Sequence, residues 1–238
     1  MRLDKALAPA GLSRSDAKKA IRQGRVAVDG RTASDPGMDV EGKAVFLDGR
    51  PVEPDRPVHV MIHKPKGMVT AARDNSYDAI YELLSPEVVR RKPGACGRLD
   101  QDVTGLVIMT TDGQLAHRLI SPKRSVAKRY RATVEGKIGE SAAERFRQGI
   151  EFKDFTTLPA ELTILEAGEE KSLIEIVITE GKYHQVKRMC AAVGCPVLEL
   201  SRIEEAGVRL DEALLPGEWR HLTEEEVAQL YRAAGMEQ

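Results

Sequence analysis

The sequence predicts an α+β protein in which a small amino-terminal module is joined by a linker to a larger domain built on a mostly antiparallel sheet. The chain has 238 residues, which is enough for one small module and one medium-sized domain. A proline-dense stretch over residues 49–57 separates the two parts. Beyond it, segments with strand and helix periodicity alternate without the strict βαβ rhythm of a parallel sheet.

Residues 1–48 have the pattern of a compact α/β unit. A helical period covers residues 3–11 and ends at a glycine. Ser13 or Ser15 can then cap a second helix, which is basic. Two short strands follow, each closed by an Asp-Gly turn, at 25–30 and 45–49.

Residues 49–57 read Gly-Arg-Pro-Val-Glu-Pro-Asp-Arg-Pro, and no other stretch of the chain is as rich in proline. Proline at this spacing favours an extended, semi-rigid linker. We therefore expect the larger domain to cover residues 58–238. Its strands are expected at 58–63, 105–110, 128–135, 160–166, 172–179 and 197–202, and its helices at 78–84, 113–120, 140–148, 184–193 and 223–233.

The composition predicts a cytoplasmic protein that does not cross a membrane. No apolar run approaches the ~18–20 residues that a bilayer requires, and no secretory signal is visible. The three cysteines, Cys96, Cys190 and Cys195, match neither a disulfide framework nor a zinc site. The formal net charge of −1 conceals an uneven distribution. Residues 1–25 hold seven basic and two acidic side chains, whereas residues 204–238 hold three and nine. A local basic patch of this kind attracts a phosphate backbone.

Residues 97–113 hold the densest group of side chains capable of chemistry. A glycine-bounded loop with Arg98, Asp100 and Asp102 runs directly into an apolar strand. Carboxylates at such a junction are held by a rigid scaffold and suit a nucleophile or a base. By spacing alone, Asx turns explain the two aspartates equally well. A calcium loop fits poorly, because its twelfth position would be Thr111 rather than glutamate.

Residues 180–190 form a second cluster, Glu-Gly-Lys-Tyr-His-Gln-Val-Lys-Arg-Met-Cys. A helix is expected to begin near His184, so its amino-terminal amides, with Lys187 and Arg188, would bind a phosphate or pair with a carboxylate. The competing interpretation is a solvated basic face with a structural histidine. No second metal ligand lies at a suitable spacing, so no metal is assigned.

Residues 118–131 carry six basic side chains and no acid, with Tyr130 as their single aromatic residue. Basic side chains that follow phosphates, interleaved with an aromatic that stacks on a base, are typical of RNA binding. Tyr130 could also be an ordinary strand residue facing the core. A charged turn at 63–67, which contains Lys64, ends the first strand of the larger domain.

In this order, the segments resemble the RsuA-like family of pseudouridine synthases. Gly-Arg-Leu-Asp at 97–100, followed by Thr-Gly-Leu at 104–106, is similar to the family's catalytic loop. The resemblance implies that Asp100 is the catalytic aspartate, with Arg98 beside it. It further implies that Tyr130 stacks on the target uracil and that Lys187 pairs with Asp100. Residues 1–48 look like the family's S4-like (alpha-L) RNA-binding module, and residues 216–226 resemble its carboxyl-terminal end.

Two positions depart from the family pattern. Val103 stands where Thr or Ser is usual, which removes no proposed catalytic group. Residues 203–206, Ile-Glu-Glu-Ala, replace a stretch that usually carries another Arg and a Gly pair. Glu204 would be unfavourable near a phosphate.

The resemblance implies site-specific isomerisation of uridine to pseudouridine in ribosomal RNA. The form of the second cluster favours small-subunit (16S) RNA as the substrate. The reaction itself needs no cofactor, and we expect a monomeric enzyme that acts on an assembling small-subunit particle. RNA contacts are expected from side chains of the module and of the larger domain, namely Arg2, Lys5, Arg14, Lys18, Arg22, Lys64, Lys128, Arg129, His184, Gln185 and Arg188.

Two other function classes compete. A non-catalytic RNA-binding or ribosome-assembly factor would also use a basic amino-terminal module, but an inactive relative would be expected to lose Asp100 or Tyr130. A carbohydrate-active hydrolase would use Asp100 and Asp102 as paired acids. We expect those two carboxyl groups to point to opposite sides, which is a poor arrangement for that reaction.

Overall fold

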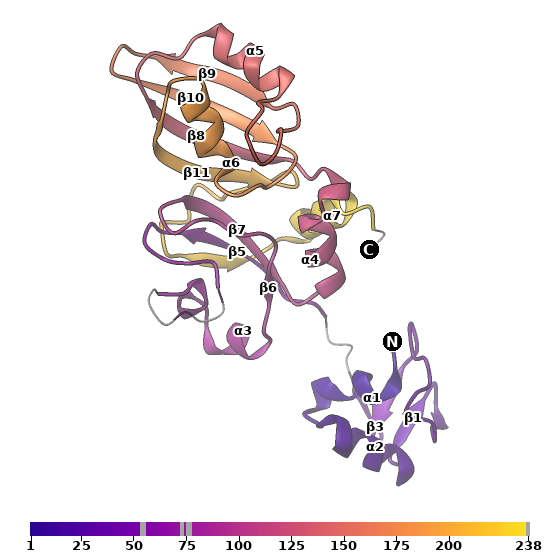
Figure 1. Cartoon of the computed structure of the whole chain (residues 1–238). Coiled ribbons are helices and arrows are strands. Elements are labelled where there is room, and N and C mark those ends of the chain that lie inside the picture. The colour runs from indigo at the N-terminus through magenta and orange to yellow at the C-terminus, as the bar shows by residue number, and fades with distance from the viewer. Residues whose placement is uncertain (53–55, 72–73, 75–77, 237–238) are drawn as a thin grey trace. The chain divides into compact units, whose positions relative to one another are not determined.

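The computed structural model describes residues 1–52, 56–71, 74 and 78–236. The chain divides into two compact units, Met1–Pro57 and Val58–Gln238 (Figure 1). Each unit has a hydrophobic core of its own: a single cluster in the smaller unit and two clusters in the larger one.

The smaller unit packs two helices, α1 (Leu3–Ala6) and α2 (Arg14–Arg22), and a 3-10 turn, Ala8–Ala10, with a four-stranded sheet. Ser13 caps α2, because its hydroxyl accepts a hydrogen bond from the Asp16 amide at 3.2 Å. The sheet is antiparallel in the order β2-β1-β3-β4, with β1 at Val26–Val28, β2 at Arg31–Thr32, β3 at Val45–Leu47 and β4 at Arg50–Val52.

The expected start of the linker at residue 49 is wrong. Arg50–Val52 forms β4 and pairs with β3, with Val52 opposite Val45. Pro51 is tolerated there because β4 is an edge strand of its sheet. Of the rest of the expected linker, residues 53–55 lie outside the described part of the chain.

The larger unit is built on a nine-stranded sheet in the order β13-β5-β7-β11-β8-β10-β9, with β6 added beside β7 and β12 beside β11. Among these pairings only β7 with β11 is parallel, so the expected mostly antiparallel sheet is confirmed. The strands are β5 His59–Lys64, β6 Gly94–Ala95, β7 Thr104–Thr110, β8 Lys128–Glu135, β9 Glu161–Ala167, β10 Lys171–Ile178, β11 Val197–Glu205, β12 Val208–Arg209 and β13 Trp219–His221. The helices are α3 Pro86–Arg90, α4 Gly113–Ile120, α5 Glu140–Gln148, α6 Gln185–Ala192 and α7 Glu224–Ala233, with 3-10 turns at Ile80–Leu83 and Pro122–Arg124.

The two halves of this sheet are covered differently. β5 and β7 are almost continuously buried, because hydrophobic clusters pack on both of their faces. One of these clusters includes residues of α4 and α7. By contrast, β8 and β10 alternate between buried and accessible residues, so only one of their faces is covered. That face packs against α5 and α6 (Figure 1).

The parallel pairing of β7 with β11 requires glycine at position 105. Gly105 lies opposite Arg202 on β11, and Arg202 in turn lies opposite Tyr130 on β8. The φ of Gly105 is +104°, and a Cβ at this position would lie 2.3 Å from the Arg202 carbonyl oxygen. Only glycine allows the strands to come this close, which brings the start of β7 to the same level as Tyr130.

Candidate catalytic site

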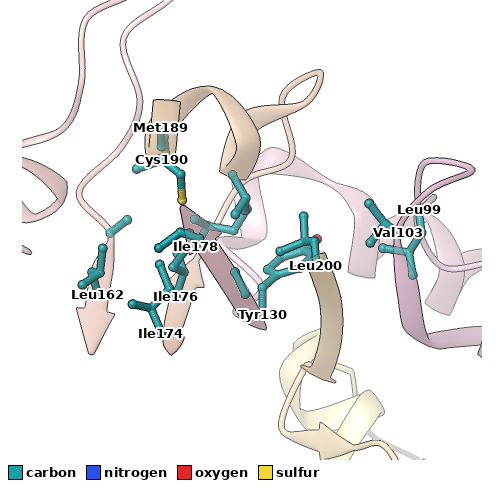
Figure 2. Close-up of a cluster of buried hydrophobic side chains, with 14 of the residues drawn as sticks. Leu99, Val103, Tyr130, Leu162, Ile174, Ile176, Ile178, Met189, Cys190 and Leu200 are labelled. Carbon is teal, nitrogen blue, oxygen red and sulfur yellow. The ribbon is translucent and has the colours of Figure 1, made fainter. Parts of the chain in front are cut away.

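The loop that precedes β7 and the first turn of α6 enclose a pocket of about 90 Å³. Its apolar walls come mainly from Leu99, Val103, Ile178, Val186 and Leu200, and Figure 2 shows Tyr130 beside Leu200 in the adjoining core. Pockets for drug-sized ligands measure roughly 300–1,000 Å³, so this one suits a single small ring. The polar side chains that line it are Arg98, Asp100, Tyr130, Lys182, His184, Gln185 and Lys187.

One ammonium group joins two carboxylates at the pocket. Lys187 Nζ lies 3.2 Å from Asp100 Oδ2 and 2.7 Å from Asp102 Oδ1. Partial burial lowers the pKa of Lys187, but hydrogen bonds to Asp102 and Asp100 outweigh it, so the pKa lies above the usual lysine value. The hydrogen bond between Lys187 and Asp102 also lowers the pKa of Asp102. The pair is therefore charged at neutral pH. His184 Nε2 completes the group, 3.4 Å from Asp100 Oδ2.

The expectation that Asp100 and Asp102 diverge is wrong. Both contact the same ammonium group. Residues two apart on an extended segment share a face rather than point to opposite sides, and here the chain turns at residues 101–102. Asp102 nevertheless lies outside the pocket lining, so the two carboxylates do not face each other across a substrate position.

The loop that carries Asp100 is held by the turn that follows β5. The Thr70 hydroxyl both accepts a hydrogen bond from the Leu99 amide and donates one to the Leu99 carbonyl, each at 3.1 Å. The Gly67 amide donates to the Gln101 carbonyl at 2.8 Å, and the Gln101 side chain donates back to the Gly67 carbonyl at 3.0 Å. These contacts fix the backbone on either side of Asp100.

Lys64 belongs to this support, which corrects its expected role as an RNA contact. Its side chain is fully buried, and its ammonium donates to the carbonyls of Pro65, Gln101 and Val103 at 3.1, 3.2 and 2.7 Å. Three acceptors satisfy all three ammonium donors. Burial lowers the pKa of Lys64 to about 8. An ammonium group buried in this way ties β5 to the loop and cannot reach a phosphate.

Tyr130 reaches the pocket from β8 and is supported by a buried ion pair. Its ring is 8% exposed, and burial raises the pKa of its hydroxyl, which interacts with the Arg202 guanidinium. Arg202 lies 3.0 Å from Glu205, and both side chains are buried. Arg202 also donates to the Leu106 carbonyl at 2.8 Å. The tyrosine is therefore held in place beside the loop, with its hydroxyl protonated at neutral pH.

The first turn of α6 divides into pocket residues and structural ones. The expected RNA contact Gln185 is only 3% exposed, and its amide spans the Glu180 carboxylate and the Lys182 backbone N–H. It therefore shapes the turn. Arg188 pairs with Asp154 at 2.5 Å and lies over the rings of Phe152 and Phe155. These contacts hold Arg188 against the 152–155 loop and not against Asp100.

With this geometry established, comparison with protein-family models identifies the two parts of the chain. Residues 58–192 match the model described as RNA pseudouridylate synthase, and residues 1–46 match the S4 domain. The first match covers more than half of the chain. The chain belongs to the RNA pseudouridylate synthase family. It is thus an isomerase that converts uridine to pseudouridine in RNA, and the expected enzyme class and S4-like module are confirmed.

Relatives of this RNA pseudouridylate synthase are similar over nearly their whole length. A protein of Escherichia coli K12 named ribosomal small subunit pseudouridine synthase A is 42% identical over 234 residues, covering 96% of this chain and 99% of the relative. A Bacillus subtilis protein named uncharacterized RNA pseudouridine synthase YtzG is 40% identical over 231 residues, covering 95% and 97%. A solved structure titled crystal structure of pseudouridylate synthase superposes with a TM-score of 0.69 at 36% identity and covers 97% and 99% of the two chains.

Lys128 and Arg129, two further residues expected to contact RNA, are not among those that line the pocket of the synthase. Lys128 turns back to the Val126 carbonyl at 3.0 Å, and Arg129 lies between Glu175 and Glu204 at 3.5 and 3.7 Å. In those positions their charges are partly compensated. Glu204, the departure from the family pattern, thus acts as a partner for a nearby arginine.

In the S4 unit, Arg2 and Arg14 flank the buried carboxylate of Asp4 at 3.1 and 3.2 Å while their own side chains stay more than half exposed. They therefore have a structural role as well as a surface charge. Lys5 and Arg22 are exposed and Lys18 is half-buried, so the basic face expected from the sequence is presented by this unit.

Sequence patterns alone indicate Asp102 only as a second acid of the Asp100 loop, and they do not indicate Arg202 at all. The spacing of Asp102 from Asp100 is the available signal, because two residues share a face when they are two apart on an extended segment. Arg202 has no local signal. Its place beneath Tyr130 depends on the pairing of β11 with both β7 and β8.

Among the described residues, no group of three or more His, Cys, Asp or Glu side chains could hold a metal ion. Within the same part of the chain, every helix is too short or too polar to span a bilayer. The three cysteines are free and buried.

Proposed function

We propose that the chain isomerises one specific uridine of small-subunit (16S) ribosomal RNA to pseudouridine, with Asp100 as its catalytic carboxylate. The observation that carries this proposal is the position of Asp100, which lines a pocket of single-ring size and lies 3.2 Å from Lys187. The name of the 42% identical relative from Escherichia coli supports the small-subunit substrate.

The reaction needs a carboxylate at the ribose or at the base. The bond between C1′ and N1 of the uridine breaks, the freed uracil rotates, and a bond forms between C1′ and C5. C5 then loses a proton and N1 gains one, so no atoms come from a donor and we propose no cofactor. Asp100 acts either as a nucleophile or as a base, and in both cases its negative charge is consumed in the intermediate.

The other pocket residues have distinct roles in this proposal. The ammonium of Lys187 lies 3.2 Å from Asp100 Oδ2, where it offsets the charge of the carboxylate. Tyr130 holds the uracil by stacking against it, on a side chain that the core fixes in place. Arg98 is exposed at the pocket rim, where a guanidinium suits the phosphate or ribose of the bound nucleotide. His184 lies 3.4 Å from the same oxygen of Asp100 as Lys187 does and would contact the same nucleotide.

The substrate must present its uridine out of the base stack. A pocket lined by the Asp100 loop and α6 cannot take a base that is still paired in a helix, so the uridine is flipped out. Selection of one uridine in a structured RNA then rests largely on shape and backbone contacts. The basic S4 unit, with Lys5, Lys18 and Arg22, would supply contacts to the phosphates.

We further propose that the enzyme acts in the cytoplasm as a monomer on an assembling small-subunit particle. Within the described residues, one chain supplies Asp100, Tyr130 and Lys187 to the same pocket, so the proposed reaction calls for no second copy. Ribosomal proteins order the RNA during assembly, which would present the target uridine in a defined shape.

The test is a single-turnover assay on small-subunit ribosomal RNA bound to ribosomal proteins. Pseudouridine is mapped by carbodiimide modification and reverse transcription. We expect one new stop with the wild type and none with Asp100→Asn, which should still bind the RNA. Turnover by Asp100→Asn well above background would contradict the role of Asp100. If product formed on large-subunit RNA instead, the proposed substrate would be wrong, and if it formed on neither RNA, a binding factor would be the better interpretation.

A further inference from the structure

We propose that Asp102 is a positioning residue that holds the Lys187 ammonium beside Asp100 throughout the reaction. This inference rests on the function proposed above, because it assumes that Asp100 is the catalytic carboxylate. It assigns a function to a carboxylate that is not among the residues lining the pocket.

The distances favour Asp102 as the main partner of Lys187. Its Oδ1 lies 2.7 Å from Lys187 Nζ, whereas the Asp100 oxygen lies at 3.2 Å. The Lys187 side chain is 24% exposed and that of Asp102 is 60% exposed. The lysine is therefore the more buried member of the pair and needs a fixed counter-charge more than Asp102 does.

The charge of Asp100 changes during the reaction, and that of Asp102 does not. When Asp100 forms a covalent bond or takes up a proton, it becomes neutral. A partly buried ammonium with Asp100 as its only partner would then be left without a counter-charge, and it would move toward solvent or release a proton. Asp102 stays ionised, because the hydrogen bond from Lys187 lowers its pKa. The ammonium therefore remains in place and can pair with Asp100 again when the product forms.

The other charges around Lys187 do not replace Asp102. His184, the residue before α6, contacts Asp100 at 3.4 Å, and Lys64, on β5, is a cation that repels Lys187. Asp100 and Asp102 are its only hydrogen-bonded acid partners among the described residues. With Asp102 removed, Lys187 would pair with Asp100 alone in the free enzyme. In the intermediate, where Asp100 is neutral, Lys187 would have no acidic partner.

The chain offers a matched control one residue further along α6. Arg188 pairs with Asp154 at 2.5 Å, and the Asp154 side chain is 61% exposed, which is close to the value for Asp102. Each aspartate thus neutralises a basic residue of the first turns of the same helix. Only Asp102 does so for a residue that contacts Asp100.

The kinetic test compares Asp102→Asn with Asp154→Asn on the small-subunit RNA particle. We expect Asp102→Asn to lower kcat on the order of 10-fold, within the range of coupling between contacting charges, with KM unchanged. Asp154→Asn should leave kcat unchanged. An Asp102→Asn enzyme with wild-type kcat, or one that changes only KM, would overturn the proposal.

A double-mutant cycle shows whether Asp102 acts through Lys187. If it does, Asp102→Asn should have no further effect on kcat in a Lys187→Met background. The same fold-decrease in both backgrounds would mean that Asp102 acts independently of the lysine, and the proposal would fail. Asparagine has the same shape as aspartate and lies here on an exposed turn, so we expect equal melting temperatures.

A measurement without RNA separates this proposal from the proposed function. The pKa of Lys187 can be measured from the pH dependence of its acylation, with the modified residue located by mass spectrometry. Asp102→Asn should shift this pKa downward, and Asp154→Asn should not. An unshifted value would overturn the positioning role even in an active enzyme. Absence of pseudouridine in the wild type, with the Lys187 shift present, would instead refute only the proposed function.

Discussion

At the scale of single residues, the role of a charged side chain in this enzyme depends on its burial more than on its residue type. Lys64 and Lys187 are both lysines within the motifs that resemble the family, yet one is fully buried against carbonyl oxygens and the other lines the pocket. A sequence motif identifies both as important. It cannot show that Lys64 points inward, because burial depends on strands that are distant in the sequence.

The burial of Lys64 predicts a pH-dependent contribution to stability. Its pKa is lowered to about 8 in the folded chain, whereas an unfolded lysine titrates near ~10.4. Between these values the unfolded state binds more protons than the native state, so this group makes the free energy of unfolding rise with pH. Below pH ~8 both states are protonated and the contribution is constant.

Urea denaturation of the wild type and of Lys64→Met at pH 7 and pH 9.5 measures this contribution. We expect the difference in unfolding free energy between the two proteins to grow by on the order of 1 kcal/mol at the higher pH. At pH 7 the variant should already be less stable, because three carbonyls are left without their donor. A difference that is the same at both pH values would show that Lys64 titrates normally.

At the scale of elements, periodicity in the sequence is sufficient for the long strands and helices. The bounds of ten elements lie within three residues of those expected: strands β5, β7, β8, β9, β10 and β11 and helices α4, α5, α6 and α7. The elements that periodicity misses include β2, β4, α3, β6, β12 and β13, which span two to five residues. Windows of that length hold no measurable period. The segment expected as a helix at 78–84 is a 3-10 turn, Ile80–Leu83.

The proposed catalytic residues follow the same division. Asp100, Tyr130 and Lys187 stand in local motifs, and the structure places all three at one pocket. The partners that hold them, including Asp102 and Arg202, depend on turns and on the pairing of β11 with its neighbours. Such pairings are long-range, so a local pattern could not predict them.

Gly105 is where an element-level constraint is sharpest, and Gly105→Ala tests it. A Cβ there would lie 2.3 Å from the Arg202 carbonyl oxygen, so β7 and β11 would have to separate. We expect a decrease of about 1–3 kcal/mol in unfolding free energy and a fall in kcat, since the loop with Asp100 runs directly into this residue. Urea denaturation and the single-turnover assay measure the two effects.

Gly113→Ala is the matched control for this substitution. Gly113 is the first residue of α4, which follows β7 in the chain. A Cβ at Gly113 would meet no atom within 4 Å. Alanine at a helix start should leave stability unchanged or slightly raised. If both variants behaved alike, the close approach of β7 to β11 would not be a constraint.

At the scale of the whole molecule, the uneven charge distribution indicates which of the two units attracts the RNA backbone. The amino-terminal 25 residues carry the excess of basic side chains, and the last 35 carry the excess of acids. In the larger unit, many basic side chains are paired with acids, as with Arg129, Arg131 and Arg220. Non-specific attraction to an RNA backbone is therefore expected to come mainly from the S4 unit.

This division predicts a change in the salt dependence of RNA binding. Lys5, Lys19 and Arg22 are basic side chains of the S4 unit, and removing one phosphate-binding charge lowers the slope of log K against log salt by ~0.7–0.9. The triple variant Lys5→Gln/Lys19→Gln/Arg22→Gln should therefore bind the small-subunit RNA more weakly. The plot of log K against log salt should become shallower, with the magnitude of its slope smaller by about 2. The rate of isomerisation at saturating RNA should stay the same, because the side chains that line the pocket are unchanged in this variant. Binding is measured by filter retention at low and high salt, with Arg209→Gln/Arg232→Gln in the acidic carboxyl-terminal segment as control.

An unchanged slope in the triple variant would mean that the S4 unit does not supply the main contacts to phosphate. A shallower slope in the control would place those contacts in the larger unit.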